Sequence, residues 1–541
     1  MKILFIIPPN ISYNNFIHPI HDVQIMTKQN GQTYGSVSTD PCLGCLALSS
    51  YIKKYCQNIE TKLINFNSIL YNLKIFNYKD FINFFDDYLK RIYKTYKADI
   101  ICISSLFITT YQSTINIANI CKKYLPSALI TLGGGVPSNL YKRLFKECVN
   151  IDAICYGEGE IPLADLINNH NFNNCAWITP IKLKNNFIPK FNFVNHLDEI
   201  PLYDYGLTNK DDYTNMVLTN SYGATDISLP SIQYAFSRGC IYKCGFCSIR
   251  SFHGNKVRRL SLKRILNDLT YFKSIGIKRV IFIDDFVTDN KTILLEILSY
   301  FKRLNLYPLF YSGFTVTSLD SEVLCALKDL NIEQLVLPIE SGTERILKDI
   351  IHKPLNLQII SKVVNECKKL DMYLTGNIMI GLPGETKDEI ENSIPFLTNL
   401  GLNWWSINAF SPLVGSPLYD LCIQKGYINE NTFFDNDLKH TTLTTEHFTQ
   451  EYIQERKYLL NLELNFINNI DIREGRYKTA LLGLLMTIKA NPKQAVAHYF
   501  ISKCYKQLNQ LELADKHTEI YKRIIITDNF WSSIFKQYHL E

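Results

Sequence analysis

The sequence contains no stretch of 18 consecutive apolar residues. A membrane-spanning helix needs about 20 predominantly apolar residues, so the sequence predicts no transmembrane segment. The chain also has little net charge. Its 57 Lys and Arg residues are almost balanced by 51 Asp and Glu residues, which leaves a net charge of only +6. Such a small excess in a long chain gives no reason to expect a nucleic-acid partner.

Closely spaced cysteines are few as well. The chain has 15 cysteines, but apart from one array near its middle only Cys42 and Cys45 form a close pair. The first apolar run has five residues before two prolines, which does not fit a secretory signal peptide. Scattered cysteines without such a signal are typical of reduced thiols, so we expect a cytoplasmic protein rather than a disulfide framework.

The length of the chain and its changes of pattern predict four parts. At 541 residues the chain is longer than one hydrophobic core supports. The expected parts are an α/β domain at residues 1–170, a linker at 171–228, a second α/β domain at 229–430 and a helical region at 431–541.

The array near the middle is Cys240-x3-Cys244-x2-Cys247. Three thiolates this close can bind one iron–sulfur cluster, and a four-iron cluster with three protein ligands keeps one iron open. An open coordination position is where a catalytic metal site does its chemistry. The alternatives are a zinc knuckle or three unrelated thiols, but no second Cys or His pair follows at zinc-finger spacing. The array therefore favours a cluster.

Residues 1–170 predict a doubly wound α/β domain. The expected elements are strands at Lys2–Ile7, Asp99–Ser104 and Ala128–Leu132 and helices at Thr114–Tyr124 and Asn139–Glu147. Ligands of such domains bind where the strand ends meet loops. Here the loop Ser104-Ser105-Leu106 offers hydroxyl groups, and the loop Gly133-Gly134-Gly135 lets a bulky ligand approach the backbone.

Residues 229–430 repeat strand and helix. The expected strands are Gln233–Phe236, Arg279–Ile283, Leu309–Ser312, Gln334–Pro338 and Asn377–Ile380. The expected helices are Lys263–Ile275, Lys291–Leu304, Glu322–Leu330, Leu357–Leu370 and Lys387–Leu400. Repeated βα units favour a parallel, incomplete barrel with its site at the carboxyl ends of the strands.

Carboxylates and glycines fall at three of those strand ends. Asp284 and Asp285 end one strand, and we expect only one of them to face the barrel axis, because adjacent strand residues point opposite ways. Glu340 ends another and can accept hydrogen bonds from a ribose diol, while Arg345 can pair with a carboxylate. Gly381 ends a third and allows close approach of an adenosyl group. Each carboxylate, taken singly, is as easily a helix cap or a surface ion pair.

The cysteine array resembles the signature of radical S-adenosylmethionine (SAM) enzymes, and the three later motifs match that family's motifs in order and spacing. The resemblance implies that Cys240, Cys244 and Cys247 bind a 4Fe-4S cluster, whose open iron takes the amine and carboxylate of SAM. It also implies that Phe246 lies against the adenine. The SAM contacts implied are Phe246, Asp284, Asp285, Glu340, Ser341, Arg345 and Gly381.

The two loops of the first domain, with Pro41–Lys53 and Ala153–Glu160, are similar to the cobalamin-binding domain that precedes many radical SAM domains. The cobalamin contacts implied are Ser104, Ser105, Leu106, Gly133, Gly134, Gly135, Gly157 and Glu158. The Asp-x-His-x-x-Gly motif of many corrinoid proteins is absent, and His18 and His21 lie too early to replace it. We therefore expect no histidine ligand on the lower face of cobalamin.

Cys42 and Cys45 stand where the family usually carries small apolar residues. A metal site is the alternative, but we expect buried thiols, because free cysteine is among the most buried residue types.

The last hundred residues resemble a tetratricopeptide (TPR) array. Ala480 and Ala514 are 34 residues apart, Pro492 follows the first by twelve, and Tyr505 precedes the second by nine. Fewer than three repeats rarely stand alone, so we expect this tail to dock on the catalytic body. A helical cap without partners and a groove that docks a protein or peptide both remain open.

Together the resemblances imply a cobalamin-dependent radical SAM methyltransferase. A 5'-deoxyadenosyl radical would abstract hydrogen from an unactivated carbon of a small metabolite, lipid or peptide, and methylcobalamin would supply the methyl group. An external flavodoxin- or ferredoxin-like protein would donate the electron. The alternatives are a cobalamin-dependent cyclase or rearrangement enzyme, and a corrinoid- or cluster-bearing sensor or scaffold.

Overall fold

The computed structural model describes residues 1–19, 25–37, 39–208, 229–310, 312–332, 334–429, 433 and 443–540. His21, weighed above as a cobalt ligand, lies outside them. The described chain forms two compact units. The first takes the residues up to Gly313 together with those from Ser411 to Phe433, and the second takes Phe314–Phe410 and the residues from 443 on. No helix in the described ranges is long and apolar enough to cross a membrane.

The first unit begins with a doubly wound α/β fold around a six-stranded sheet. The strand order is β4 (Glu60–Asn65), β1 (Lys2–Ile7), β5 (Ile100–Ser104), β6 (Leu129–Gly133), β7 (Ala153–Cys155) and β8 (Trp177–Ile178). All neighbours are parallel except β7 and β8. The strands run with their carboxyl ends at one edge, which is where a ligand site is expected.

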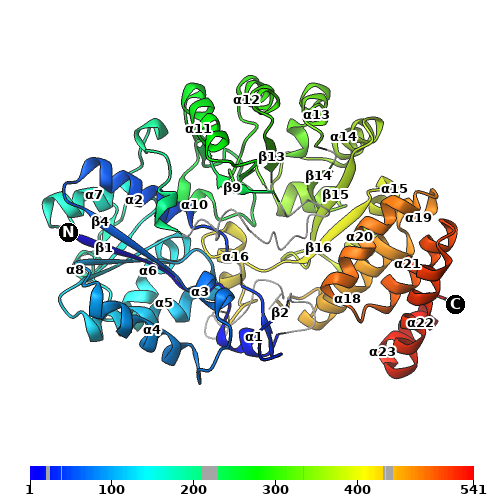
Figure 1. The fold of residues 1–541 in the computed structure, drawn as a ribbon, viewed down its shortest axis with the longest axis horizontal. Helices are drawn as coiled ribbons and strands as arrows, with labels where there is room; N and C mark the ends of the chain where they lie inside the picture. The colour runs from blue at the N-terminus through cyan, green and yellow to red at the C-terminus, as the bar shows by residue number, and fades with distance from the viewer. Residues whose placement is uncertain are drawn as a thin grey trace. The chain divides into compact units, whose positions relative to one another are not determined.

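Helices cover both faces of this sheet (Figure 1). Helices α2 (Leu43–Tyr55) and α7 (Glu160–Asn169) pack together on one face, and α4 (Phe81–Thr95), α5 (Tyr111–Tyr124) and α6 (Gly135–Glu147) cover the other. Strand β1 is apolar throughout its interior, with Ile3, Leu4, Phe5 and Ile6 fully buried. Such a continuous apolar run is what a parallel strand covered on both faces requires.

Shorter elements complete this part of the unit. They are α1 (Tyr13–Ile17), the antiparallel pair β2 (Ile25–Thr27) and β3 (Thr33–Gly35), α3 (Phe66–Asn72) and α8 (Pro180–Lys184).

The first unit also holds the start of the second α/β region. Its parallel sheet has the order β13 (Tyr307–Phe310), β12 (Arg279–Phe282) and β9 (Ser231–Tyr234), with helices α11 (Leu262–Ser274) and α12 (Lys291–Leu304). The short antiparallel pair β10 (Ser237–Arg238) and β11 (Arg258–Arg259) brackets the cysteine array, with α10 (Arg250–His253) between them. Helix α16 (Pro417–Gln424) belongs here as well.

The second unit continues the strand–helix pattern. Its parallel sheet has the order β14 (Gln334–Glu340), β15 (Tyr373–Ile380) and β16 (Trp404–Ala409), with helices α13 (Ser321–Lys328), α14 (Leu357–Lys369) and α15 (Lys387–Leu400). Strand β16 is the one parallel strand of this region that the sequence did not predict. From Trp405 to Ala409 apolar residues alternate with Ser406 and Asn408, a period of two that is typical of a strand and that the prediction overlooked.

The tail of the chain packs on this sheet within the second unit. Its helices are α18 (Gln450–Leu462), α19 (Ile470–Arg473), α20 (Tyr477–Ala490), α21 (Ala495–Gln507), α22 (Leu511–Thr527) and α23 (Asn529–Gln537). The side chain of Asn465 accepts a hydrogen bond from the Trp405 backbone N–H at 2.7 Å and donates to its carbonyl at 2.8 Å. The side-chain amide of Asn465 thus forms the two backbone hydrogen bonds at Trp405 that a neighbouring strand would otherwise supply at this edge of β16. The TPR-like character of these helices stays a prediction.

Candidate cofactor cavity and cysteine loop

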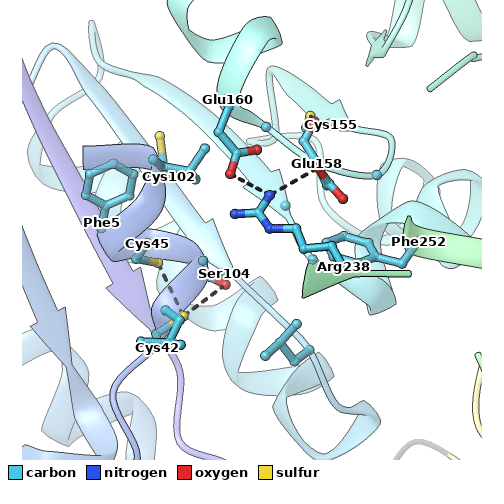
Figure 2. A pocket seen from close by; sticks show the side chains of 18 of the residues that line it. Phe5, Cys42, Cys45, Cys102, Ser104, Cys155, Glu158, Glu160, Arg238 and Phe252 are labelled. Carbon is cyan, nitrogen blue, oxygen red and sulfur yellow. Dashed lines mark hydrogen bonds and ion pairs between the residues drawn. The ribbon is translucent and has the colours of Figure 1, made fainter. Parts of the chain in front are cut away.

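A cavity of about 430 Å³ lies at the carboxyl ends of β1, β5 and β6 (Figure 2). Phe5, Ser104 and Gly133 contribute to its wall from these three strands. Further wall residues come from the segment that leads into the cysteine array, namely Ser237 and Arg238. The strand ends of the first α/β region and the entrance to the cysteine loop therefore share one cavity.

Six of the eight residues predicted to contact cobalamin line this cavity. They are Ser104, Leu106, Gly133, Gly134, Gly157 and Glu158. Ser105 is fully buried instead, and its hydroxyl bonds that of Thr110 at 2.6 Å. Gly135 begins α6 and is also not part of the wall. These two residues shape the loops, and the cobalamin contacts of all eight stay predictions.

The glycines after β6 have two different roles. A β-carbon on Gly134 would collide with the carbonyl oxygen of Ser105, and the positive φ of Gly134, +107°, also disfavours a side chain. A β-carbon on Gly133 would meet no heavy atom within 4 Å, and the same holds for a β-carbon on Gly44, which also lines the cavity. The missing side chains of Gly133 and Gly44 thus leave open space, which fits a bulky, largely apolar ligand such as a corrinoid.

Glu158 is the centre of a buried group of charges. Its carboxylate accepts hydrogen bonds from Arg238 at 3.0 Å and from two nitrogens of Arg258, and it lies 2.6 Å from Nδ1 of His253. Arg238 also pairs with Glu160 at 2.8 Å. Burial alone raises the pKa of Glu158, but the three cationic partners outweigh it and hold the pKa well below its usual range.

This charge cluster connects two loops. Glu158 belongs to the loop after β7, whereas Arg238 precedes Cys240 by two residues and His253 and Arg258 follow Cys247. Both ends of the cysteine loop are therefore tied to the wall of the cavity. His253 also lines the cavity, and it comes from α10. The expectation that no histidine ligates cobalt concerned the first α/β region, to which His253 does not belong.

Replacing Glu158 by alanine is expected to lower the free energy of unfolding by about 3 to 5 kcal/mol, because it leaves buried cations without their carboxylate. Chemical denaturation of the full-length chain measures this. Asp87→Ala is the matched control: it removes the exposed Arg91–Asp87 ion pair and should cost about 1 kcal/mol or less. Equal losses in the two variants would contradict a special role for the buried cluster.

The three cysteines of the array lie on one half-buried loop. Cys247 donates its backbone N–H to the carbonyl of Cys244. Burial, with smaller contributions from the neighbouring Cys244 and Cys240, raises the pKa of Cys247 to about 12. Ligation requires the thiolate forms, and the positive charge of a bound metal would stabilise them in this half-buried loop.

A single metal ion and a four-iron cluster make different demands on the arrangement of the three cysteines. Throughout the residues that the structure describes, no three His, Cys, Asp or Glu side chains are grouped to hold one ion. A four-iron cluster has a different requirement, because each cysteine binds a different iron and the sulfurs are spread around the cluster.

Asp284 and Asp285 hold the segment that enters the cysteine loop. Asp284 accepts hydrogen bonds from the backbone N–H groups of Phe236 at 3.0 Å and Ser237 at 2.6 Å, and Asp285 accepts from that of Gly239 at 2.8 Å. The prediction that only one of the two carboxylates faces the barrel axis stays a prediction. Strand β12 ends at Phe282, so both carboxylates lie beyond the pleat and reach the same segment.

Burial raises the pKa of Asp284 to about 7. Asp285 lines the cavity, and Phe246 is half-buried on the cysteine loop. Contacts of these three residues with SAM stay predictions, while their contacts with the loop are part of the fold.

The remaining predicted SAM residues lie in the second unit. Glu340 follows a bulge in β14, has a φ of +68° and accepts a hydrogen bond from Lys353 Nζ at 2.6 Å. Ser341 is buried beside it and accepts a hydrogen bond from the Thr343 backbone N–H. The strained backbone at Glu340 is typical of a functional position.

Arg345 and Gly381 have partners of their own within the second unit. Arg345 donates to both carboxylate oxygens of Glu389, at 2.5 and 2.6 Å, so a ligand carboxylate would have to compete with Glu389. Gly381 has a φ of +82° and donates its backbone N–H to Glu385 at 2.7 Å. Glu385, which the sequence analysis did not single out, also accepts from the N–H of Leu382 and so shapes the turn after β15.

Glu385 is expected to make stability fall as pH rises. Burial raises the pKa of Glu385 to about 8, so the folded chain keeps a proton that the unfolded chain releases near pH 4. The stability that protonated Glu385 contributes is fully present below about pH 4. It is lost between about pH 4 and 8, which lowers the free energy of unfolding by on the order of a few kcal/mol. Glu385→Gln should flatten this slope in denaturant unfolding of the full-length chain.

Glu389→Gln is the control of opposite sign. Pairing with Arg345 lowers the pKa of Glu389. The stability that ionised Glu389 contributes is therefore lost as pH falls below about 4, and stability in the neutral range does not change with pH through this group. Identical slopes between pH 4 and 8 in the wild type and in Glu385→Gln would contradict the first expectation.

Comparison with known proteins identifies both α/β regions. Residues 234–397 match the radical SAM superfamily and residues 51–167 match the B12 binding domain. The chain therefore contains the two domains that its motifs resemble, and the predicted mixed α/β fold with a helical C-terminal region is confirmed. The cofactors of these families are a 4Fe-4S cluster, SAM and cobalamin.

The chain is also similar to a methyltransferase and to solved radical SAM enzymes that bind cobalamin. The cytidylyl-2-hydroxyethylphosphonate methyltransferase of Streptomyces wedmorensis is 26% identical over 64% of this chain and 70% of its own length. The structure of the cobalamin-dependent SAM radical enzyme OxsB with aqua-cobalamin has a TM-score of 0.60 and 14% identity, and covers 98% of this chain and 84% of OxsB. The radical SAM methyltransferase TsrM from Kitasatospora setae, solved with cobalamin and a 4Fe-4S cluster, has a TM-score of 0.56 and 11% identity over 79% of both chains.

Proposed function

We propose that this radical SAM protein with a B12 binding domain is a cobalamin-dependent methyltransferase, which methylates an unactivated carbon of a small metabolite, lipid or peptide. The observation that carries the proposal is the shared cavity: Gly133 of β6 and Arg238 at the entrance of the cysteine loop line the same space. A corrinoid held there lies beside the loop proposed to bind the cluster. The methyltransferase names of two of the relatives above support the choice of reaction.

The residues of the chain would divide the work as follows. Cys240, Cys244 and Cys247 hold the cluster, and Asp284 and Asp285 keep the segment before them in place through its backbone N–H groups. When bound, SAM and the cluster supply a 5'-deoxyadenosyl radical and cobalamin carries a methyl group.

Other residues position SAM and keep water away. Glu340, Ser341, Arg345 and Gly381 are proposed to bind SAM, with Phe246 against its adenine. The apolar wall of the cavity, which includes Phe5, excludes water from the reacting groups.

The proposal assigns residues 1–170 to cobalamin, 171–228 to a linker, 229–430 to the radical SAM domain and 431–541 to a TPR-like region. A flavodoxin- or ferredoxin-like protein would donate the electron, and the helices from α20 to α23 would form any contact with a further protein. We also propose a cytoplasmic location, because a 4Fe-4S cluster with an open iron needs a reducing environment.

Isotope transfer tests the reaction without knowledge of the substrate. The full-length chain is purified anaerobically, loaded with iron, sulfide and cobalamin, reduced, and given SAM with a deuterated methyl group. We expect cobalamin near one per chain, deuterated methylcobalamin in the corrinoid fraction and 5'-deoxyadenosine among the products.

The other outcomes overturn particular parts of the proposal. Cobalamin bound at well below one per chain would overturn the cofactor assignment. If 5'-deoxyadenosine formed but the corrinoid carried no labelled methyl group, methyl transfer would be rejected in favour of the cyclase or rearrangement reaction. Reduced protein that never cleaves SAM would replace the enzyme by a sensor or scaffold.

A further inference from the structure

Four cysteines that the cluster does not use line the cavity. They are Cys42, Cys45, Cys102 and Cys155 (Figure 2). Cys42 and Cys45 differ from the other two because their sulfur atoms are in contact, 3.5 Å apart. The sulfur of Cys42 also lies 3.8 Å from the hydroxyl of Ser104 at the end of β5. The pair therefore sits at the strand edge where the cavity begins.

The two thiols of the pair have different environments. Cys42 is half-buried at the N-cap of the 13-residue helix α2, whereas Cys45 is buried in the first turn of that helix. The contact between the thiols lowers the pKa of Cys42 to about 7 and raises the pKa of Cys45 well above its usual value. A half-buried thiol with a lowered pKa, in contact with a second, buried thiol three residues later, is the arrangement of Cys-x-x-Cys redox pairs.

We propose that Cys42 and Cys45 form a thiol–disulfide exchange site in the wall of the cofactor cavity, with a small-molecule disulfide such as oxidised glutathione as its co-substrate. The thiolate of Cys42 attacks one sulfur of the disulfide, a mixed disulfide forms, and one thiolate leaves. Cys45 gives up its proton and attacks the sulfur of Cys42, which releases the second thiolate. Two protein thiols are thus oxidised to one disulfide, and one disulfide is reduced to two thiols.

Closure of the pair changes the cavity itself. A disulfide replaces the 3.5 Å contact between the two sulfurs by a covalent bond about 2 Å long beside Ser104, which is one of the residues proposed to contact cobalamin. The site therefore places a redox-dependent group in the wall of the cofactor cavity. Only this coupling rests on the proposed function, since the exchange itself needs no cofactor.

Cys102 provides the matched comparison within the same cavity. Burial raises its pKa to about 12, and its sulfur accepts a hydrogen bond from Thr131. Its thiol is therefore expected to be a poor nucleophile.

Redox titration of the full-length chain tests the exchange. Cobalamin-free protein is equilibrated anaerobically with reduced and oxidised glutathione, quenched with acid and alkylated, and its peptides are weighed. We expect the peptide that carries both cysteines to lose two hydrogens reversibly. In Cys45→Ser the reaction should stop at a mixed disulfide of Cys42 with glutathione, and Cys102→Ser should close its pair as the wild type does. If Cys42 and Cys45 of the wild type were both alkylated at every ratio of reduced to oxidised glutathione, no disulfide would have formed and the proposal would be overturned.

Alkylation kinetics test the coupling to the cavity. Added hydroxocobalamin should slow the labelling of Cys42 by about tenfold or more and leave that of the exposed Cys325 unchanged. Cys42 labelling at the same rate with bound cobalamin would overturn the coupling and leave the exchange site in place. A chain that binds no cobalamin but still closes the disulfide would overturn the proposed function and not this inference.

Discussion

Cys240→Ala is expected to lose the iron–sulfur cluster completely, and with it all formation of 5'-deoxyadenosine. The loop supplies only three thiolates, so the removal of one leaves too few protein ligands to hold a four-iron cluster against dissociation. Iron analysis and the absorption of the reconstituted, anaerobically purified chain measure the cluster, and chromatography of the SAM reaction measures the cleavage.

Cys325→Ala is the control for this result. Cys325 is exposed on α13 and has no place in the array, so its loss should leave both the iron content and SAM cleavage unchanged. Wild-type iron content in Cys240→Ala would contradict the cluster assignment. A cluster that survives with altered absorption would show that another residue replaces the cysteine.

Gly133→Leu is expected to weaken cobalamin binding by about 100-fold or more, which corresponds to about 3 kcal/mol. A β-carbon at this position meets no protein atom within 4 Å, so the leucine side chain would occupy the cavity and not strain the fold. Titration of the full-length chain with hydroxocobalamin, followed by absorption, measures the change. The iron content of the same samples should stay at the wild-type level and shows that the chain is folded.

Gly135→Ala separates a blocked cavity from a damaged loop. Gly135 is two residues away, lies outside the cavity wall, and its added β-carbon would make only an ordinary contact, 3.5 Å from the carbonyl of Leu106. We expect its cobalamin affinity to stay within about threefold of the wild type. Equal losses in both variants would indicate that the loop itself was disturbed and would contradict the steric argument.

The local pattern of the sequence located the strands and helices that it marks clearly, but it did not single out strands β4 and β7 or helices α2, α4 and α7 of the first α/β region. Strand β1 and helices α12 and α15 were predicted to the residue, because a long apolar run or a clear helical period marks each of them. Prediction failed for β16, although apolar and polar residues alternate from Trp405 to Ala409 and the tail packs against the strand. Asn465 pairs with the backbone of Trp405 from 60 residues away.

The loops of the candidate site could be located from the sequence, but not what individual side chains do there. Glu158 was expected to contact cobalamin because of its position in a loop. The structure surrounds it with Arg238, His253 and Arg258, which lie 80 to 100 residues further along the chain. Pairings over such distances leave no periodic signal. The same reason explains why the link from Asp284 to Ser237 was not foreseen. Glu385 is a different case, because it contacts Gly381 and Leu382 only four and three residues away and was overlooked within its motif.

The charge cluster around Glu158 also limits how freely this B12 binding domain can be exchanged. A chimaera that joined a foreign corrinoid module to residues 229–541 would inherit Arg238 and Arg258 as buried cations, and their carboxylate partners would be left behind. Unpaired buried charges cost more than an ordinary loop graft can compensate. Modular engineering of this protein therefore has to move the Glu158 and Glu160 carboxylates together with the cysteine loop, whatever linker joins the two pieces.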